Sequence, residues 1–324
     1  MDDYVLSVRA VRNGAFVADV GPSKFLVVPP GQSPAPSQAI TQSAWYKAVR
    51  AAAAWQNERG EARGDLLFVV HGYNMSVADV IQRHRRLKED LIALGFKGVI
   101  ASFDWPSDDK ALAYLPDRHR AKDAAFRLVS DGIAYLSAEQ TPSCRINIHV
   151  FGHSTGAYVI REAFDDADDN ELPNMSWTVS QVLFAAGDVS ALSMVAGDGK
   201  SESLYRHCIR LTNYASRYDQ ALDLSNVKRL GVSPRVGRIG LPGDAPQQAV
   251  NVDCTAYYEK LADPASGIAA QDSPNGFMGI QSHSWYFGNL TFTRDLFGVV
   301  IGEERTVIPT RAVAPDGRVA LKKP

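Results

Sequence analysis

A serine between two glycines is the feature of this 324-residue sequence that most directly suggests chemistry. Ser154 lies at the centre of Gly152-His153-Ser154-Thr155-Gly156, a G-x-S-x-G pentapeptide. The apolar run at 146–151 predicts a buried strand before it, and residues 157–164 have the spacing of a helix. A strand, a tight turn with serine at its apex and a helix are the context of a nucleophile elbow. We therefore expect a catalytic serine; the alternative is an ordinary glycine turn.

A serine hydroxyl needs a base within hydrogen-bond reach before it attacks a carbonyl, and the base needs an orienting acid. In folds with this elbow the chain order is serine, acid, histidine. Only His207 and His283 follow Ser154. Since His207 immediately precedes a predicted strand, it belongs at the opposite end of the sheet. We expect His283 to be the general base, in a loop entering a helix near Ser284; the alternative is a surface histidine.

Two aspartates are candidates for the acid. Asp219 follows the predicted strand 208–214, and Asp188 follows the strand before it, 181–186. Both positions are at the carboxyl ends of strands, where ligands bind in open α/β sheets. We rank Asp219 first because it lies two strands beyond the elbow, the usual donor in this fold. Asp188 stays as the alternative acid, and either aspartate could instead cap the following helix.

The oxyanion formed during acyl transfer needs preorganised donors. One expected donor is the backbone N–H of Thr155, which follows the nucleophile, and the other is that of Tyr73, in the loop after the predicted strand 66–70. We expect His71 to order this loop through hydrogen bonds, because it precedes the nucleophile in the chain.

Two further residues are candidates for the substrate pocket. Trp105 follows a strand at the same sheet edge and would line the pocket, although a core tryptophan is an equal alternative. His153 borders the nucleophile and would have either a structural role or a place in the pocket wall. The run Asp165–Asp169 lacks the glycine and terminal glutamate of a calcium loop. We therefore expect this run to be a solvated helix end. The chemistry of a serine nucleophile implies no metal and no cofactor.

The elements that must position these residues alternate along the chain. Strand-like runs separated by helical segments predict a mostly parallel central sheet flanked by helices. The runs lie at 66–70, 98–103, 146–151, 179–186 and 208–214, with a last possible strand at 250–254, and the main helical segments at 43–57, 77–94 and 109–138.

A different pattern precedes this alternation. Residues 4–28 predict a β-meander of three short strands that ends at Pro29-Pro30, and a Pro-rich loop follows to about residue 40. We expect one domain over 1–324, with this N-terminal part at 1–40 and a catalytic core at 65–302.

Composition excludes several classes of function. The formal net charge of −2 gives no reason to expect nucleic acid as a partner. No apolar run approaches the length of a membrane span, and the N-terminus lacks the features of a signal peptide. We expect a cytoplasmic protein acting on a small-molecule acyl substrate. The oligomeric state stays open.

Together the motifs resemble the α/β-hydrolase superfamily, and more narrowly the bacterial α/β hydrolases known as DUF900. The similar segments are 68–74, 103–107, 152–156, 214–222 and 282–287. The resemblance implies an α/β-hydrolase fold with the family's acid at Asp219. Thr155 and Asp104 replace the family's usual Met and Ser, and we expect both to reshape the acyl pocket.

The expected function is hydrolysis of carboxylic esters through an acyl-enzyme on Ser154. A lipase, thioesterase, amidase or acyltransferase with the same triad is an alternative, because loops rather than the triad select the substrate. A non-catalytic α/β-hydrolase module that binds a small molecule or a protein is the alternative from another class.

Overall fold

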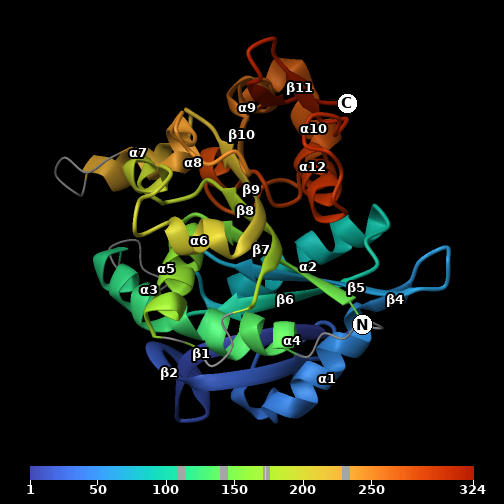
Figure 1. Ribbon diagram of the computed structural model, residues 1–324, viewed down its shortest axis with the longest axis vertical. Helices are drawn as coiled ribbons and strands as arrows, with labels where there is room; N and C mark the ends of the chain where they lie inside the picture. The colour runs from blue at the N-terminus through green and yellow to red at the C-terminus, as the bar shows by residue number, and fades with distance from the viewer. Residues whose placement is uncertain (108–113, 139–144, 171, 173–175, 228–233) are drawn as a thin grey trace.

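One large sheet runs through the molecule (Figure 1). The computed structural model describes residues 1–324 except 108–113, 139–144, 171, 173–175 and 228–233. The strand order is β11-β12-β10-β9-β8-β7-β5-β6-β1-β2-β3, with β4 paired beside β5. The strands are β1 (Asp3–Arg12), β2 (Ala15–Val28), β3 (Ala39–Ile40), β4 (Ala54–Gln56), β5 (Ala62–Val70), β6 (Val99–Asp104), β7 (Arg145–His153), β8 (Val179–Ala185), β9 (Cys208–Ala215), β10 (Ala249–Asp253), β11 (Arg311–Val313) and β12 (Val319–Leu321).

Strands β12, β10, β9, β8, β7, β5, β6 and β1 are neighbours in this order, and each adjacent pair is parallel. Antiparallel pairing occurs toward the two edges: β2 and β3 follow β1 at one, and β11 pairs with β12 at the other. The short β4 also pairs antiparallel with the first residues of β5. The mostly parallel sheet is therefore as predicted. Its parallel strands bring their carboxyl ends to one edge, where the candidate residues of several strands can meet.

Helices cover both faces of the sheet. The α-helices are α1 (Gln42–Ala53), α2 (Val77–Ala93), α3 (Tyr114–Leu128), α4 (Ala134–Ala138), α5 (Thr155–Asp169), α6 (Glu202–Arg206), α7 (Gln220–Val227), α8 (Val236–Ile239), α9 (Thr255–Ala262), α10 (Ile268–Asp272), α11 (Gln281–Ser284) and α12 (Leu290–Val300). Alternate residues of β5 point to opposite faces, as the pleat requires. Phe68 packs into a core with α1, α3 and α5, whereas Leu67 packs into a second core with α2, α9 and α12.

The N-terminal part differs from the predicted three-stranded meander. Residues 15–20 and 25–28 belong to one long strand, β2, and the third strand is the short β3. The pairing of β2 with β1 shifts register between Lys24 and Val20. Gly21 lies in this irregular stretch, where a Cβ would lie 2.4 Å from the Cα of Ala10 on β1. Strand β1 also pairs in parallel with β6, so the hairpin extends the main sheet.

Other elements correct the sequence-based boundaries. The helix expected at 43–57 ends at Ala53, and β4 follows it. The helical segment expected from residue 109 is described from Tyr114 onward, and a π-helical stretch at Val129–Ile133 separates α3 from α4. Strand β10 is not the last, because β11 and β12 complete that edge of the sheet.

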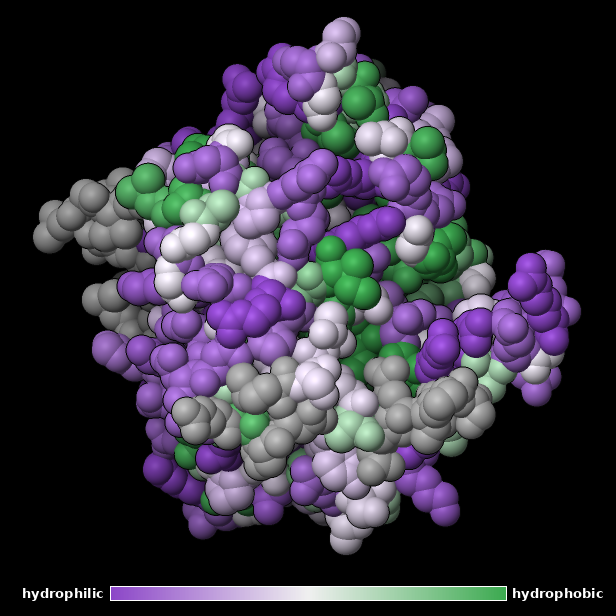
Figure 2. All heavy atoms as spheres, in the orientation of Figure 1, coloured by the Kyte–Doolittle hydropathy of each residue, from purple (hydrophilic) through white to green (hydrophobic). Residues whose placement is uncertain are grey.

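The surface in the view of Figure 2 is mainly hydrophilic, and its hydrophobic residues lie in small separate patches. Within the described part of the chain, no helix combines the length and the apolar character that crossing a membrane would require.

Candidate active site

Ser154 lies at a sharp turn between β7 and α5. Its backbone has φ 57° and ψ −124°, a conformation that non-glycine residues rarely adopt. Neighbouring backbone fixes it there: the Ser154 N–H donates to the carbonyl of Ala185, and the Ser154 carbonyl accepts from the N–H of Asp188, each over 3.0 Å. The strained geometry of the predicted elbow is therefore present.

The two flanking glycines let the chain pass close to this turn. A Cβ on Gly156 would lie 2.1 Å from the carbonyl oxygen of Val70, and a Cβ on Gly152 would lie 2.6 Å from Cδ1 of Ile160. Neither space admits a side chain. Gly156 thus allows α5 to begin directly against the end of β5, and Gly152 allows the end of β7 to lie against the first turns of α5.

His283 and Asp219 meet at the carboxyl edge of the sheet. Nδ1 of His283 lies 2.7 Å from Oδ2 of Asp219, and both side chains are buried. The other carboxylate oxygen, Oδ1, accepts the N–H of Leu222 in the first turn of α7, so Asp219 also caps this helix. His283 lies within the short helix α11, not in a loop before a helix as the sequence predicted.

The rival candidates have other partners. Asp188 lies 3.0 Å from Nε of Arg235 in a buried ion pair. His207 stacks on Trp177 and places Nε2 2.8 Å from Asp168, at the beginning of β9. The structure therefore brings Asp219, rather than Asp188, to His283.

Ser154 and His283 line the same cavity. Its volume is about 370 Å³, and its other walls come mainly from residues 72–75, residues 278–280 and α2. The loop at 72–75 crosses close to the serine, since a Cβ on Gly72 would lie 2.9 Å from the Ser154 Cβ and 3.3 Å from its Oγ.

Both expected oxyanion donors lie beside this point. Tyr73 follows Gly72 in the cavity wall. Thr155 is the first residue of α5, and N–H groups in the first turn of a helix have no acceptor within it and carry the positive end of the helix dipole. The backbone N–H groups of Tyr73 and Thr155 stay the predicted oxyanion donors.

His153 lines the cavity and is buried. Its Nε2 lies 2.9 Å from the carbonyl oxygen of His283, so Nε2 carries the hydrogen, and its Nδ1 lies 3.4 Å from Arg83. Burial, with the charges of His283 and Arg83, holds the His153 pKa well below its usual range. A neutral His153 thus links Arg83 to the backbone of the candidate base.

Arg83, within the helical segment predicted at 77–94, is a cavity residue for which the sequence suggested no role. It donates to the carbonyl of Met278 and to Oγ of Ser284, over 2.8 and 3.2 Å, and lies over the ring of Phe287. Burial lowers its pKa to about 10. These three partners lie about 200 residues away along the chain, so helical spacing alone could not have indicated them.

Three expected pocket residues do not line this cavity. Trp105 is fully buried, donates its Nε1–H to the carbonyl of His71 and stacks on the His71 ring. It is therefore a core tryptophan, the alternative given for it above, and does not line the cavity. The side chain of Thr155 is buried away from the cavity. Asp104 is buried in an ion pair with Arg9. Neither departure from the family pattern therefore lines the cavity.

Metal ligands do not gather near this cavity: within the described ranges, no three His, Cys, Asp or Glu side chains come close enough to hold an ion.

Residues 49–251 match the family described as alpha/beta hydrolase of unknown function (DUF900). The chain belongs to this family. The family and the α/β-hydrolase fold expected from the motifs are thus confirmed. The matched range includes Ser154 and Asp219 but ends before His283 and begins after β1. No curated protein matches the chain.

Solved structures show distant similarity. A hyperthermophilic esterase from the archaeon Pyrobaculum calidifontis is 15% identical over 59% of this chain and 67% of its own, with a TM-score of 0.32. A dienelactone hydrolase from Anabaena variabilis is 16% identical over 83% and 93%, with a TM-score of 0.35. A cutinase-like protein from Cryptococcus sp. is 15% identical over 74% and 96%, with a TM-score of 0.34.

Proposed function

We propose that this protein is a serine hydrolase of carboxylic esters, with Ser154 as nucleophile, His283 as general base and Asp219 as the acid that orients it. The observation that carries the proposal is the 2.7 Å contact of Asp219 with Nδ1 of His283, a residue that lines the same cavity as Ser154. This contact turns Nδ1 toward the carboxylate and leaves Nε2 for the serine proton.

The reaction uses these groups in two steps. Oγ of Ser154 attacks the carbonyl carbon while its proton passes to Nε2 of His283. The backbone N–H groups of Tyr73 and Thr155 stabilise the oxyanion. The bond to the leaving alcohol then breaks, and His283 returns the proton to the alcohol oxygen. Water repeats the sequence on the acyl-enzyme, releasing the carboxylic acid and restoring the serine.

The cavity favours a small acyl group. Its volume of about 370 Å³ is near the lower end of the roughly 300–1,000 Å³ typical of ligand sites. Met75, Met278 and Ile280 provide apolar surface beside the serine for a short chain. We expect kcat/KM for p-nitrophenyl esters to be highest for short acyl chains and to fall toward decanoate.

The deciding experiment is covalent labelling. A fluorophosphonate probe should label the folded protein at Ser154 and abolish ester hydrolysis, whereas Ser154→Ala should be neither labelled nor active above the buffer rate. A folded wild-type protein that takes up no probe and hydrolyses none of the esters would reject the enzyme and favour a non-catalytic binding module.

A further inference from the structure

We propose that Arg9, on the N-terminal strand β1, is a positioning residue that fixes the loop at residues 72–75, here called the oxyanion loop. The inference rests on the proposed function, since it concerns the loop that would supply one oxyanion donor. Arg9 lies outside the range that matches the family and contacts neither the cavity nor Ser154. It would therefore act on the reaction only through the loop.

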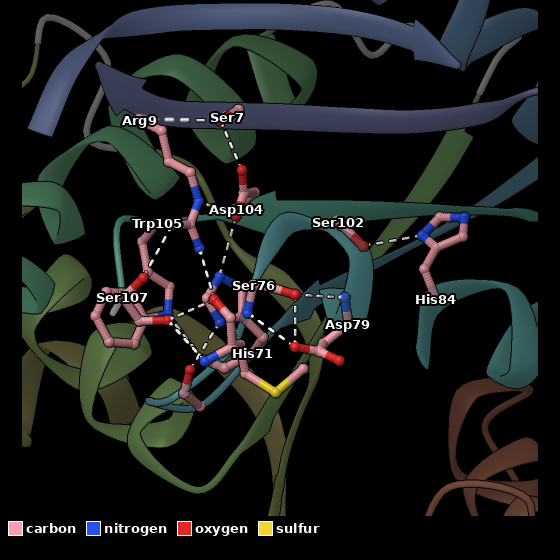
Figure 3. A network of polar contacts seen from close by, with 12 residues as sticks. Ser7, Arg9, His71, Ser76, Asp79, His84, Ser102, Asp104, Trp105 and Ser107 are labelled. Carbon is pink, nitrogen blue, oxygen red and sulfur yellow. Dashed lines mark hydrogen bonds and ion pairs between the residues drawn. The ribbon is translucent and has the colours of Figure 1, made fainter. Parts of the chain in front are cut away.

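The guanidinium group of Arg9 makes three hydrogen bonds in the interior, each with a different nitrogen (Figure 3). Its Nε donates to Oδ1 of Asp104 over 2.7 Å. Its two terminal nitrogens donate to the carbonyls of Ser107 and Met75, each over 3.0 Å. The planar fork of arginine holds these three acceptors in a fixed arrangement, which lysine with one nitrogen cannot reproduce.

Met75, the last residue of the oxyanion loop, is held from a second direction. The hydroxyl of Ser107 accepts the Met75 N–H over 3.2 Å and lies 3.1 Å from the Met75 carbonyl oxygen. Arg9 binds the carbonyls of both residues, so it ties β1, the segment after β6 and the loop together.

The residue before the loop is also tied to this network. Trp105 donates to the carbonyl of His71 over 2.8 Å, and Nε2 of His71 lies 3.4 Å from Oδ1 of Asp104. Nδ1 of His71 lies 2.7 Å from the carbonyl oxygen of Gly72. The loop is therefore held at both ends, and Tyr73 lies between them.

The charges of the network are balanced within it. Burial alone would raise the pKa of Asp104, but Arg9 and His71 outweigh it and lower this pKa to about 2. The carboxylate is thus charged at neutral pH and keeps Arg9 directed at the loop. A buried ion pair is weak grounds for stability by itself. The ion pair would instead matter because it fixes the position of the oxyanion loop. A displacement of about 1 Å of a group in an active site can cost roughly a hundredfold in rate.

Arg9→Lys tests the proposal. Lysine keeps the charge beside Asp104 but loses the bonds to the carbonyls of Met75 and Ser107. We expect kcat per labelled active site to fall at least about tenfold. The fall should not exceed the roughly hundred- to thousandfold cost of losing a whole oxyanion donor. KM should change much less. Phenylboronic acid, whose tetrahedral serine adduct uses the same donors, should bind more weakly in proportion to the loss in kcat.

Arg85→Lys is the matched control. Arg85 binds a buried carboxylate, Asp3, with its Nε over 2.7 Å and also donates to the carbonyls of Pro29 and Gln32. It secures the same hairpin but does not contact the oxyanion loop. Its lysine variant should lose stability while keeping kcat per labelled site and boronic acid affinity.

Ser107→Ala covers the case in which Arg9→Lys does not fold. It removes the hydroxyl that holds Met75 and leaves the ion pair intact, so it should lower kcat and boronic acid affinity together. The positioning role is overturned if Arg9→Lys, or Ser107→Ala in its place, matches Arg85→Lys in both readouts. Absence of labelling and hydrolysis in the wild type would instead overturn the proposed function, which keeps the two failures distinct.

Discussion

Two buried aspartates near the elbow have different partners: one contacts a histidine and the other an arginine. Asp219 lies against His283, and Asp188 against Arg235. We expect Asp219→Asn to lower kcat by about ten-thousandfold, because an amide stabilises the wrong tautomer of the histidine and does not stabilise the imidazolium. Asp188→Asn should change kcat less than about tenfold and mainly reduce stability, because it weakens a buried ion pair.

Steady-state kinetics and urea unfolding of both variants separate these effects. The reverse order, with the larger loss of kcat at Asp188, would show that the acid is assigned wrongly.

His153 makes the stability of the protein depend on pH. An unfolded histidine titrates near pH 6.5, whereas His153 stays neutral in the fold because its pKa is depressed. Below pH 6.5 the unfolded chain therefore binds a proton that the folded chain does not, and the free energy of unfolding falls as pH falls. The slope from this group approaches about 1.4 kcal/mol per pH unit. His84 adds to it, because burial also lowers its pKa.

Urea unfolding between about pH 7.5 and 5.5 tests this linkage. His153→Gln should flatten the slope, whereas His119→Gln, at an exposed position, should leave it as it is. Equal slopes for the wild type and His153→Gln would contradict the linkage.

The sequence was sufficient to place some of these residues and insufficient for others. Ser154 and the pairing of His283 with Asp219 follow from chain order and from the shared carboxyl edge of parallel strands. Arg9 and Arg83 do not, because what they do depends on carbonyls 66 to 195 residues away. No local pattern specifies a backbone carbonyl as a partner.

At the scale of elements, the contact between α5 and β5 depends on Gly156. Alanine is favoured over glycine inside a helix by about 1 kcal/mol. A Cβ here would nevertheless lie 2.1 Å from the Val70 carbonyl oxygen, so the strand and helix would have to separate. We expect Gly156→Ala to lower the free energy of unfolding by about 1–3 kcal/mol, the usual cost of overpacking.

Gly199→Ala is the control, since no atom lies within 4 Å of its Cβ position. Urea unfolding should show little change for this variant. A Gly156→Ala protein as stable as the wild type would contradict the prediction, because it would show that α5 and β5 can separate at the elbow without loss of stability.

Periodicity in the sequence predicted the long strands and helices, and it missed the short ones and the irregular pairing of β2 with β1. Strand β5 is an apolar run, whereas β11 and β12 have three residues each, too few for a pattern. The register shift between β1 and β2 lies where Gly21 comes close to β1, and only the pairing of the two strands determines this. The short helix α11 was likewise missed because its four residues have no detectable period.

At the scale of the whole molecule, a buried ion pair joins the C-terminal strands to the main core. Arg311 at the start of β11 binds Asp295 of α12 over 2.7 Å, and Asp295 also accepts the hydroxyls of Tyr214 and Thr310. Arg311→Met should lower the free energy of unfolding by about 3–5 kcal/mol, because it leaves a buried carboxylate without its cation.

Adding Asp295→Asn to Arg311→Met should restore part of this stability in urea unfolding, because the unpaired charge is then removed. If the double variant is less stable than Arg311→Met, the hydrogen bonds that Asp295 accepts from the two hydroxyls stabilise the fold more than its unpaired charge destabilises it.

The parallel pairing of β1 with β6 also affects how the protein is made. Strand β1 ends at Arg12, and β6 begins only at Val99. At about 5–20 residues per second, a ribosome releases β6 on the order of ten seconds after β1. During that interval the edge of β1 that will pair with β6 has no strand beside it, and such edges pair readily with other chains. Until β6 emerges, β1 is thus an aggregation hazard in the nascent chain. A chaperone that covers the hairpin of β1 and β2 during this interval should raise the yield of folded protein.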